Sequence, residues 1–188
     1  MKVFATRGYD AATTREVAMA AGVSEQLIQR YFGGKAGLLL AIMQLYAERD
    51  KAGGFGTPEP GDTVAEEIQN FLMFHLERER RAGDFARVAI YRSIVDKSVA
   101  TEMARMFTDS REPFVLSRLT ALKSRGLIRA DADLRAAAHA LSTLSFALAF
   151  NDQILFRRTA KSLKRVIAVV AGTFSIGLAA NKAESGDS

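Results

Sequence analysis

Residues 13–35, TTREVAMAAGVSEQLIQRYFGGK, decide the fold. Thr13 and Glu16 have the spacing of a capping box, in which the hydroxyl accepts from a backbone N–H and the carboxylate reaches back to the cap. Gly22 follows the last apolar residue at helical spacing, where a residue without Cβ can take the left-handed conformation that ends a helix. Ser24 is a good N-cap for the next segment, SEQLIQRYF. The stretch therefore predicts two short helices joined at a glycine, the pattern of a helix-turn-helix.

The second of these helices has one apolar and one polar face. Ile28 and Phe32 are four residues apart and are predicted to face the core, with Val23 buried in the corner before them. The opposite face carries Glu25, Gln26, Gln29 and Arg30. Such groups can hydrogen-bond base edges or phosphates, so this helix is the candidate recognition helix.

A longer stretch, RGYDAATTREVAMAAGVSEQLIQRYFGGKAGLLLAIM, resembles the DNA-binding domain of the tetracycline-repressor-like family almost position for position. The matching positions are Gly8-Tyr9, Thr13, Ala21-Gly22-Val23-Ser24, Tyr31-Phe32, Lys35 and Leu38-Leu39. The resemblance covers about the first quarter of the chain, and beyond it only length and helical character agree. It implies a dimeric transcriptional regulator that binds double-stranded DNA at a palindromic operator and is released from it, as a repressor, by a small molecule.

The resemblance and the polar face together predict which residues contact DNA. Tyr31, Lys35 and Thr13 are expected on phosphates, although a merely solvated lysine is the alternative for Lys35. Gln26, Gln29 and Arg30 are expected to read bases or adjoining phosphates. The full predicted DNA-binding set is Thr13, Ser24, Glu25, Gln26, Gln29, Arg30, Tyr31 and Lys35.

The pattern of the rest of the chain predicts helices and shows neither strand-like alternation nor repeats. Residues 51–61, KAGGFGTPEPG, form a Pro- and Gly-rich loop. Helices are predicted over residues 63–81, 84–95, 99–107, 110–125, 134–156 and 159–180. We therefore predict an all-α protein with an N-terminal helix-turn-helix three-helix head over residues 1–50, a larger C-terminal helical ligand-binding and dimerisation domain over residues 51–182, and a polar tail over residues 183–188.

Composition excludes several classes of protein. The 188 residues include no cysteine, so neither a disulfide framework nor a thiolate metal site is possible. No signal peptide opens the chain, and its most apolar run, residues 166–180, is shorter than the roughly 20 residues that span a bilayer. A cytoplasmic protein is expected. The net charge of +5 favours an acidic partner, but the basic residues are spread along the whole chain and do not identify DNA by themselves.

Two features of the larger domain suggest function. Its last two predicted helices carry small residues in rows, which suits a four-helix bundle between two copies; the alternative is that both helices belong to the domain's own core. The rows are Ala136, Ala140 and Ala147, then Ala168, Ala171, Gly172, Ser175 and Ala179. Aromatic and methionine side chains are also concentrated here, either as core or as the lining of a pocket for a small, mainly apolar effector. The predicted ligand-binding set is Phe71, Phe74, His75, Tyr91, Met103, Phe107, Phe114, Phe146 and Phe150.

The sequence offers little for an enzyme. It has no Gly-rich phosphate loop and no carboxylate-histidine metal spacing, and His75 with Glu79 makes only two possible ligands. We therefore predict no catalytic residue, no metal and no cofactor. The alternative function is a helical small-molecule-binding or structural protein that no longer binds DNA, since the first helix, residues 1–7, is shorter than the first helix of the family.

Overall fold

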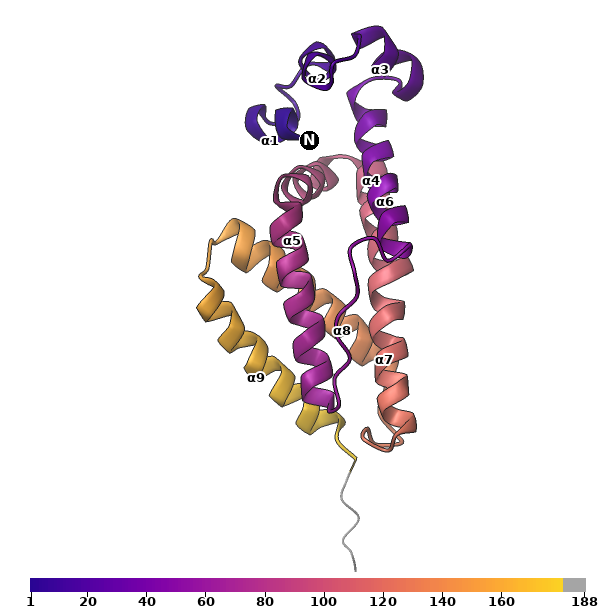
Figure 1. The fold of residues 1–188 in the computed structure, drawn as a ribbon, viewed down its shortest axis with the longest axis vertical. Coiled ribbons are helices and arrows are strands. Elements are labelled where there is room, and N and C mark those ends of the chain that lie inside the picture. Colours follow the sequence, from indigo (N-terminus) through magenta and orange to yellow (C-terminus); the bar gives the residue numbers. More distant parts are fainter. Residues whose placement is uncertain (181–188) are drawn as a thin grey trace, which may run out of the picture. The chain divides into compact units, whose positions relative to one another are not determined.

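The computed structural model describes residues 1–180, with only the backbone of Lys51 and Phe107, and the predicted polar tail lies outside this range. Figure 1 shows that the described chain is helical. Within it no strand forms; Ile128 and Ala179 make one isolated antiparallel bridge. The all-α prediction is therefore confirmed. In chain order the elements are α1 (Lys2–Arg7), α2 (Thr14–Ala21), α3 (Glu25–Phe32), α4 (Lys35–Lys51), α5 (Val64–Val95), α6 (Lys97–Met106), the π-helix η1 (Phe107–Arg111), α7 (Glu112–Ser124), α8 (Leu134–Ala147), the π-helix η2 (Leu148–Leu155) and α9 (Ala160–Leu178).

The helix-turn-helix forms at the predicted caps. The Glu16 N–H donates to Thr13 Oγ1 at 3.2 Å, and the Thr13 N–H donates to Glu16 Oε2 at 2.9 Å, which completes the capping box. Gly22 ends α2 in the left-handed region with φ 68°. Ser24 Oγ accepts from the Leu27 N–H at 3.3 Å and starts α3. Local side-chain chemistry therefore fixes both helices of the motif.

The chain packs as two compact units that do not follow a single cut in the sequence. Unit 1 comprises Met1–Gly56 and Arg81–Ser110, and unit 2 comprises Thr57–Arg80 and the chain from Arg111 onward. Helix α5 belongs to both, with its first half in unit 2 and its second half in unit 1. These bounds differ from the predicted cut after residue 50, because the second half of α5 and all of α6 pack with the head.

The core of unit 1 joins the head to those later segments. Phe4, Ile28 and Leu39 come from three helices of the head and are at most 3% exposed. Phe85, Val88 and Ala89 of α5 and Val99 of α6 are buried in the same cluster. The head, helices α1 to α4, thus completes its hydrophobic core with side chains that lie more than forty residues further along the chain.

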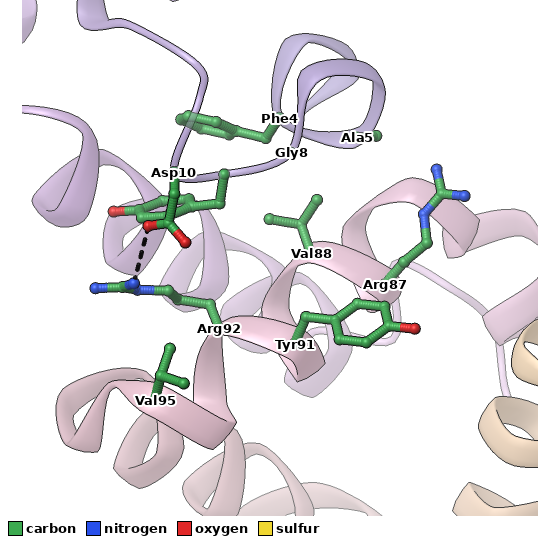
Figure 2. Close-up of a pocket in the computed structure, with 10 residues that line it drawn as sticks. Phe4, Ala5, Gly8, Asp10, Arg87, Val88, Tyr91, Arg92 and Val95 are labelled. Atoms are coloured by element: carbon green, nitrogen blue, oxygen red, sulfur yellow. Dashed lines mark hydrogen bonds and ion pairs between the residues drawn. The ribbon is translucent and has the colours of Figure 1, made fainter.

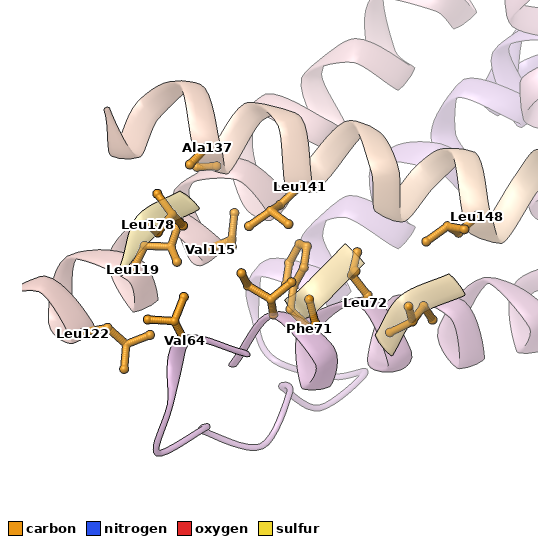
Figure 3. Close-up of a cluster of buried hydrophobic side chains, with 14 of the residues drawn as sticks. Val64, Phe71, Leu72, Val115, Leu119, Leu122, Ala137, Leu141, Leu148 and Leu178 are labelled. Atoms are coloured by element: carbon orange, nitrogen blue, oxygen red, sulfur yellow. The ribbon is translucent and has the colours of Figure 1, made fainter. Parts of the chain in front are cut away.

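Unit 2 has a separate core, shown in Figure 3. The first half of α5 contributes Phe71 and Leu72, α7 contributes Leu119 and α8 contributes Leu141. The α9 side chains Leu163, Ile167, Ala171 and Leu178 are buried in the same cluster. One face of each of the last two helices is therefore part of the core of unit 2.

Three predicted helix ends are wrong. The helix predicted to end at residue 81 does not end there: α5 runs on to Val95, and Asp84 Oδ1 accepts from Arg87 Nη2 at 2.9 Å, one turn along the same helix. The π-helix η1 occupies the break predicted between residues 107 and 110, so α6 passes into α7 without a loop. The helix predicted over residues 134–156 is α8 followed by η2, because wider π-helical turns replace its last third.

Two side chains of the motif are also less buried than predicted. Val23 is 43% exposed and Phe32 is 38% exposed, whereas Ile28 is 3% exposed. Helix α3 has only about two turns, and Ile28 fills the contact that it makes with its neighbours α2 and α4. Neighbouring helices therefore cover the middle of α3 and leave its flanks partly open.

Candidate nucleic-acid interface and interior polar cluster

Helix α3 presents a continuous polar face. The predicted reading residues Gln26, Gln29 and Arg30 are all exposed, as are Ser24 and Glu25 at the start of the helix. Tyr31 is 68% exposed, and the Arg30 guanidinium lies 5.7 Å from the centroid of its ring. A helix held by one buried side chain and exposing amides, a guanidinium and a phenol can hydrogen-bond both base edges and phosphates.

Thr13 is exposed but already engaged in capping α2. Its hydroxyl accepts from the Glu16 N–H and donates to Glu16 Oε2 at 3.1 Å. Arg7 Nη2 lies 2.9 Å from the other oxygen of the same carboxylate. The backbone N–H of Thr13 is the main cause of a lowered pKa for Glu16, so the cap carries a negative charge at neutral pH. A phosphate at Thr13 would have to share this hydroxyl with the cap.

Lys35, at the start of α4, makes contacts that the sequence did not predict. Its Nζ donates to the carbonyl oxygens of Tyr9 at 2.9 Å, Asp10 at 2.8 Å and Ala12 at 3.1 Å. It also lies 4.9 Å from the centroid of the Tyr9 ring. An ammonium group has three N–H donors, and all three are directed at carbonyls. Lys35 therefore fixes the α1–α2 connection, and its contact with phosphate stays a prediction.

The predicted ligand-binding residues divide between the two units. Tyr91 and Met103 belong to unit 1, and the side chain of Phe107 lies outside the described residues. The other six, Phe71, Phe74, His75, Phe114, Phe146 and Phe150, belong to unit 2. There the His75 ring lies 4.5 Å from the Phe71 ring and 5.3 Å from the Phe74 ring, both edge-on. Phe71 stacks with Phe114 at 6.5 Å, and Phe146 stacks with Phe150 at 5.6 Å.

His75 is the chemically distinctive member of this aromatic set. It is 3% exposed, and its Nδ1 has no hydrogen-bond partner in the described chain. Burial, followed by the charges of Arg111 and Arg78, holds its pKa well below the ordinary value. Two further buried oxygens of unit 2, Ser142 Oγ and Gln153 Oε1, also lack partners among the described residues. The interior of unit 2 thus holds a neutral imidazole and unused hydrogen-bonding capacity.

A buried ion pair lies in the same unit and was not predicted. Arg111 is 5% exposed; its Nη2 donates to Glu79 Oε1 at 2.6 Å and its Nη1 to Ser145 Oγ at 3.3 Å. Nothing in the sequence marks this pair, because Arg111 and Glu79 are 32 residues apart along the chain. Glu79 therefore compensates the charge of the buried Arg111.

Helix α9 exposes an apolar stripe opposite its buried one. Val166, Val169 and Ile176 are 38%, 68% and 83% exposed, and their spacing places them on one side of the helix. Ala168 and Ala179, two of the small residues predicted at an interface, are exposed as well, whereas Ala171 is in the core. No helix within residues 1–180 is long and apolar enough to cross a membrane. The described side chains include no group of three or more His, Cys, Asp or Glu that could hold a metal ion.

Comparisons with known proteins find a family model that matches the N-terminal helices and solved structures that share the fold. Residues 1–42 match the model of bacterial regulatory proteins of the tetR family. A transcriptional regulator from Rhodococcus sp. is 20% identical over 94% of this chain and 92% of its own, with a TM-score of 0.72. The fatty acid degradation regulator FadR from Bacillus halodurans is 19% identical over 91% of this chain and 87% of its own, with a TM-score of 0.70.

A third solved structure has the same fold. It is a TetR family transcriptional regulator from Chloroflexus aurantiacus, 19% identical over 95% of this chain and 88% of its own, with a TM-score of 0.63. No curated protein matches the chain. The fold extends over both units, whereas the family match in sequence is confined to the helix-turn-helix and the helices beside it.

Proposed function

Because the chain carries the DNA-binding domain of the tetR family of bacterial regulatory proteins and has the fold of its solved members, we propose that it is a ligand-responsive transcriptional regulator. In this proposal it acts as a homodimeric repressor that a small, mainly apolar effector releases from a palindromic operator. The exposed polar face of α3, held by the buried Ile28, is the observation that carries the proposal. In a dimer, two such helices enter successive major grooves about 34–36 Å apart.

The roles within the head can be tested on DNA. Replacing Gln29 by Ala removes one amide from the exposed face of α3 and should cost about 1–3 kcal/mol of binding on the preferred operator, with relaxed preference at one base position. Gln69→Ala, at an exposed position of α5 in unit 2, is the matched control and should bind as the wild type does. Fluorescence anisotropy with operator and with random duplex measures both effects. Equal losses on the two DNAs would contradict base reading by Gln29.

The interior of unit 2 supports the effector part of the proposal. Phe71, Phe74 and Phe114 supply an apolar surround, and the unpartnered Nδ1 of the neutral His75 offers one directed hydrogen bond. An effector with an apolar body and a single hydroxyl or amide group fits that combination. A highly charged metabolite does not, because the buried charge of Arg111 already pairs with Glu79.

A thermal-shift screen of apolar compounds, followed by operator titration with each hit, tests the effector. Medium-chain fatty acids and alcohols are a suitable first set, since one protein of the same fold is named as a regulator of fatty acid degradation. A true effector should weaken operator binding by a coupling of about 1–3 kcal/mol, and operator should weaken effector binding by the same factor. Hits that stabilise the protein and leave operator affinity unchanged would contradict the switch.

The apolar stripe of α9 supports the dimer part of the proposal. Exposed valine and isoleucine side chains beside small residues allow two helices to approach closely and bury apolar area. Val169→Asp should convert the dimer to a monomer in sedimentation velocity at micromolar concentration. Ile94→Asp is the matched control, because Ile94 is 75% exposed but belongs to unit 1. A wild-type monomer, with or without DNA, would contradict the arrangement.

A further inference from the structure

Unit 1 contains a pocket that none of these roles uses. It has a volume of about 350 Å³ and lies between α1 and the last turns of α5 (Figure 2). Cavities of roughly 300–1,000 Å³ are the size that binds small molecules in proteins. Every residue that lines it belongs to unit 1, so the pocket is separate from the aromatic cluster around His75.

Most of the pocket wall is apolar. Phe4 and Val88 are buried, with 1% and 6% exposed, and form the inner surface. Ala5 and Gly8 of the α1 side present no bulky side chain to the space. Tyr91 lines the opposite wall and is about half exposed. One wall presents the Tyr91 ring and the opposite wall presents only small groups. This shape suits a flat, apolar ligand.

One end of the pocket is a binding place for a carboxylate, because a carboxylate already occupies it. Arg92 Nη1 lies 3.3 Å from Asp10 Oδ1, the contact drawn as a dashed line in Figure 2. The same guanidinium donates from Nη2 to Asp96 Oδ2 at 3.0 Å, and its Cζ lies 4.7 Å from the centroid of the Tyr9 ring. Tyr9 and Asp96 therefore fix Arg92 in position independently of Asp10.

Asp10 is a weak occupant of that place. Its side chain is 86% exposed, so water screens its attraction to Arg92, and its contact is the longer of the two that Arg92 makes with carboxylates. The guanidinium of Arg87 stands at the other end of the lining residues in Figure 2, and its Nη2 holds Asp84 at 2.9 Å. An incoming carboxylate can therefore replace Asp10 on Nη1 without disturbing either of the intrahelical pairs.

We propose that this pocket binds a compact aromatic carboxylate, whose ring lies between the α1 wall and Tyr91 and whose carboxylate replaces that of Asp10 on Arg92. Arg87 pairs with Asp84 and Arg92 pairs with Asp96, so the pocket has no broad positive field. The carboxylate is therefore selected by its contact with Arg92 Nη1. None of the lining residues belongs to the aromatic cluster around His75 or to the predicted DNA-binding set.

Isothermal titration with 2-naphthoate and with its neutral analogue 2-naphthamide tests the class of ligand. Naphthoate should bind and naphthamide should bind at least tenfold more weakly. Loss of one charged hydrogen bond supports a difference of this size. Equal binding of the two compounds, or binding of neither, would overturn the proposal.

Asp10→Asn gives a result whose sign separates the site from a general loss of structure. Removing the competing carboxylate should raise naphthoate affinity by about two- to fivefold, as expected from the worth of an exposed ion pair. Asp131→Asn removes the same charge at an exposed position of unit 2 and should leave the affinity unchanged. An unchanged or weakened affinity in Asp10→Asn would refute the exchange of carboxylates.

Ala5→Leu fills the apolar end and should abolish naphthoate binding. Thr6→Leu adds a similar side chain at the next residue of α1, which is exposed and does not line the pocket, and should bind as the wild type does. Circular dichroism of both variants confirms that the helices are retained. If Ala5→Leu loses its structure, the affinity of Asp10→Asn for naphthoate is the test of the site. A folded Ala5→Leu variant that still binds naphthoate would refute the location.

Discussion

The two units bury polar groups in opposite ways. In unit 1 the Lys35 ammonium directs its three N–H groups at three carbonyls, and no buried side-chain nitrogen or oxygen among the described residues of that unit lacks a partner. In unit 2 His75 Nδ1, Ser142 Oγ and Gln153 Oε1 are buried without one. Each unpartnered group costs stability, by about 1–3 kcal/mol in mutational measurements.

The proposed function accounts for this difference between the units. DNA fixes the geometry of the surface that reads it, so a regulator gains from a head whose connections are tied by side chain to backbone. A ligand site gains from groups that complete their hydrogen bonds only when the ligand arrives. The contrast in hydrogen bonding is therefore what we expect if unit 1 reads DNA and unit 2 binds an effector, as proposed.

Deep core truncations should give the largest effect and test whether the units are coupled. Leu39 in unit 1 and Leu141 in unit 2 are both fully buried, and each change to Ala should lower the free energy of unfolding by about 2–5 kcal/mol. Because α5 contributes to both cores, we expect one cooperative transition in urea for each variant. Two transitions, with each substitution shifting only one of them, would show that the units are independent.

Removing Lys35 should be the next largest effect. Lys35→Met leaves the carbonyls of Tyr9, Asp10 and Ala12 without their donor and should cost about 1–3 kcal/mol of stability in chemical denaturation. Lys164→Met, at an exposed position of α9, controls for the loss of charge and should cost little. A loss of DNA affinity in Lys35→Met without any loss of stability would instead assign Lys35 to phosphate alone.

Stability should fall below neutral pH because of His75. Its pKa in the folded protein lies below its value near 6.5 in the unfolded chain, so the unfolded state takes up a proton that the folded state refuses. Above about pH 6.5 the protonation of His75 does not change the free energy of unfolding. Below that pH the free energy of unfolding falls, by at most about 1.4 kcal/mol per pH unit. Urea titrations from pH 7.5 to 5.5 measure it. His139→Gln, at an exposed histidine, should keep this loss, and a flat wild-type profile would contradict it.

The smallest effect should be a gain. His75→Leu replaces a buried imidazole, whose Nδ1 has no hydrogen-bond partner, by an apolar side chain of similar size, so it should raise the free energy of unfolding at pH 7 by about 1 kcal/mol and remove the loss at lower pH. The same variant should bind the effector more weakly. Destabilisation by His75→Leu would show that His75 already has a stabilising partner in the folded protein.

The features that the sequence predicted depend on neighbours in the chain. Thr13 with Glu16, Gly22 and Ser24 act over three or four residues, so their pattern alone located α2 and α3. The helix boundary predicted between residues 81 and 84 shows the limit of such local signals, because Gly83 and Asp84 are tolerated inside α5 when its two halves pack in two cores.

The features that were missed depend on contacts across the chain. The Lys35 ammonium meets carbonyls more than twenty residues away, and Val88 completes the core of the head from α5. Arg111 finds Glu79 and Ser145 only in the folded unit. No periodicity in the sequence marks these pairings, since each partner alone reads as a surface charge or as an ordinary apolar residue.

Selection of duplexes from a random pool by the purified protein tests the central claim, that α3 reads DNA, most directly. We predict enrichment of a sequence with two inverted half-sites, and for Gln29→Ala the same sequence with relaxed preference at one position in each half-site. An absence of enrichment together with no binding to duplex DNA at low salt, or a profile that Gln29→Ala leaves unchanged, would contradict it.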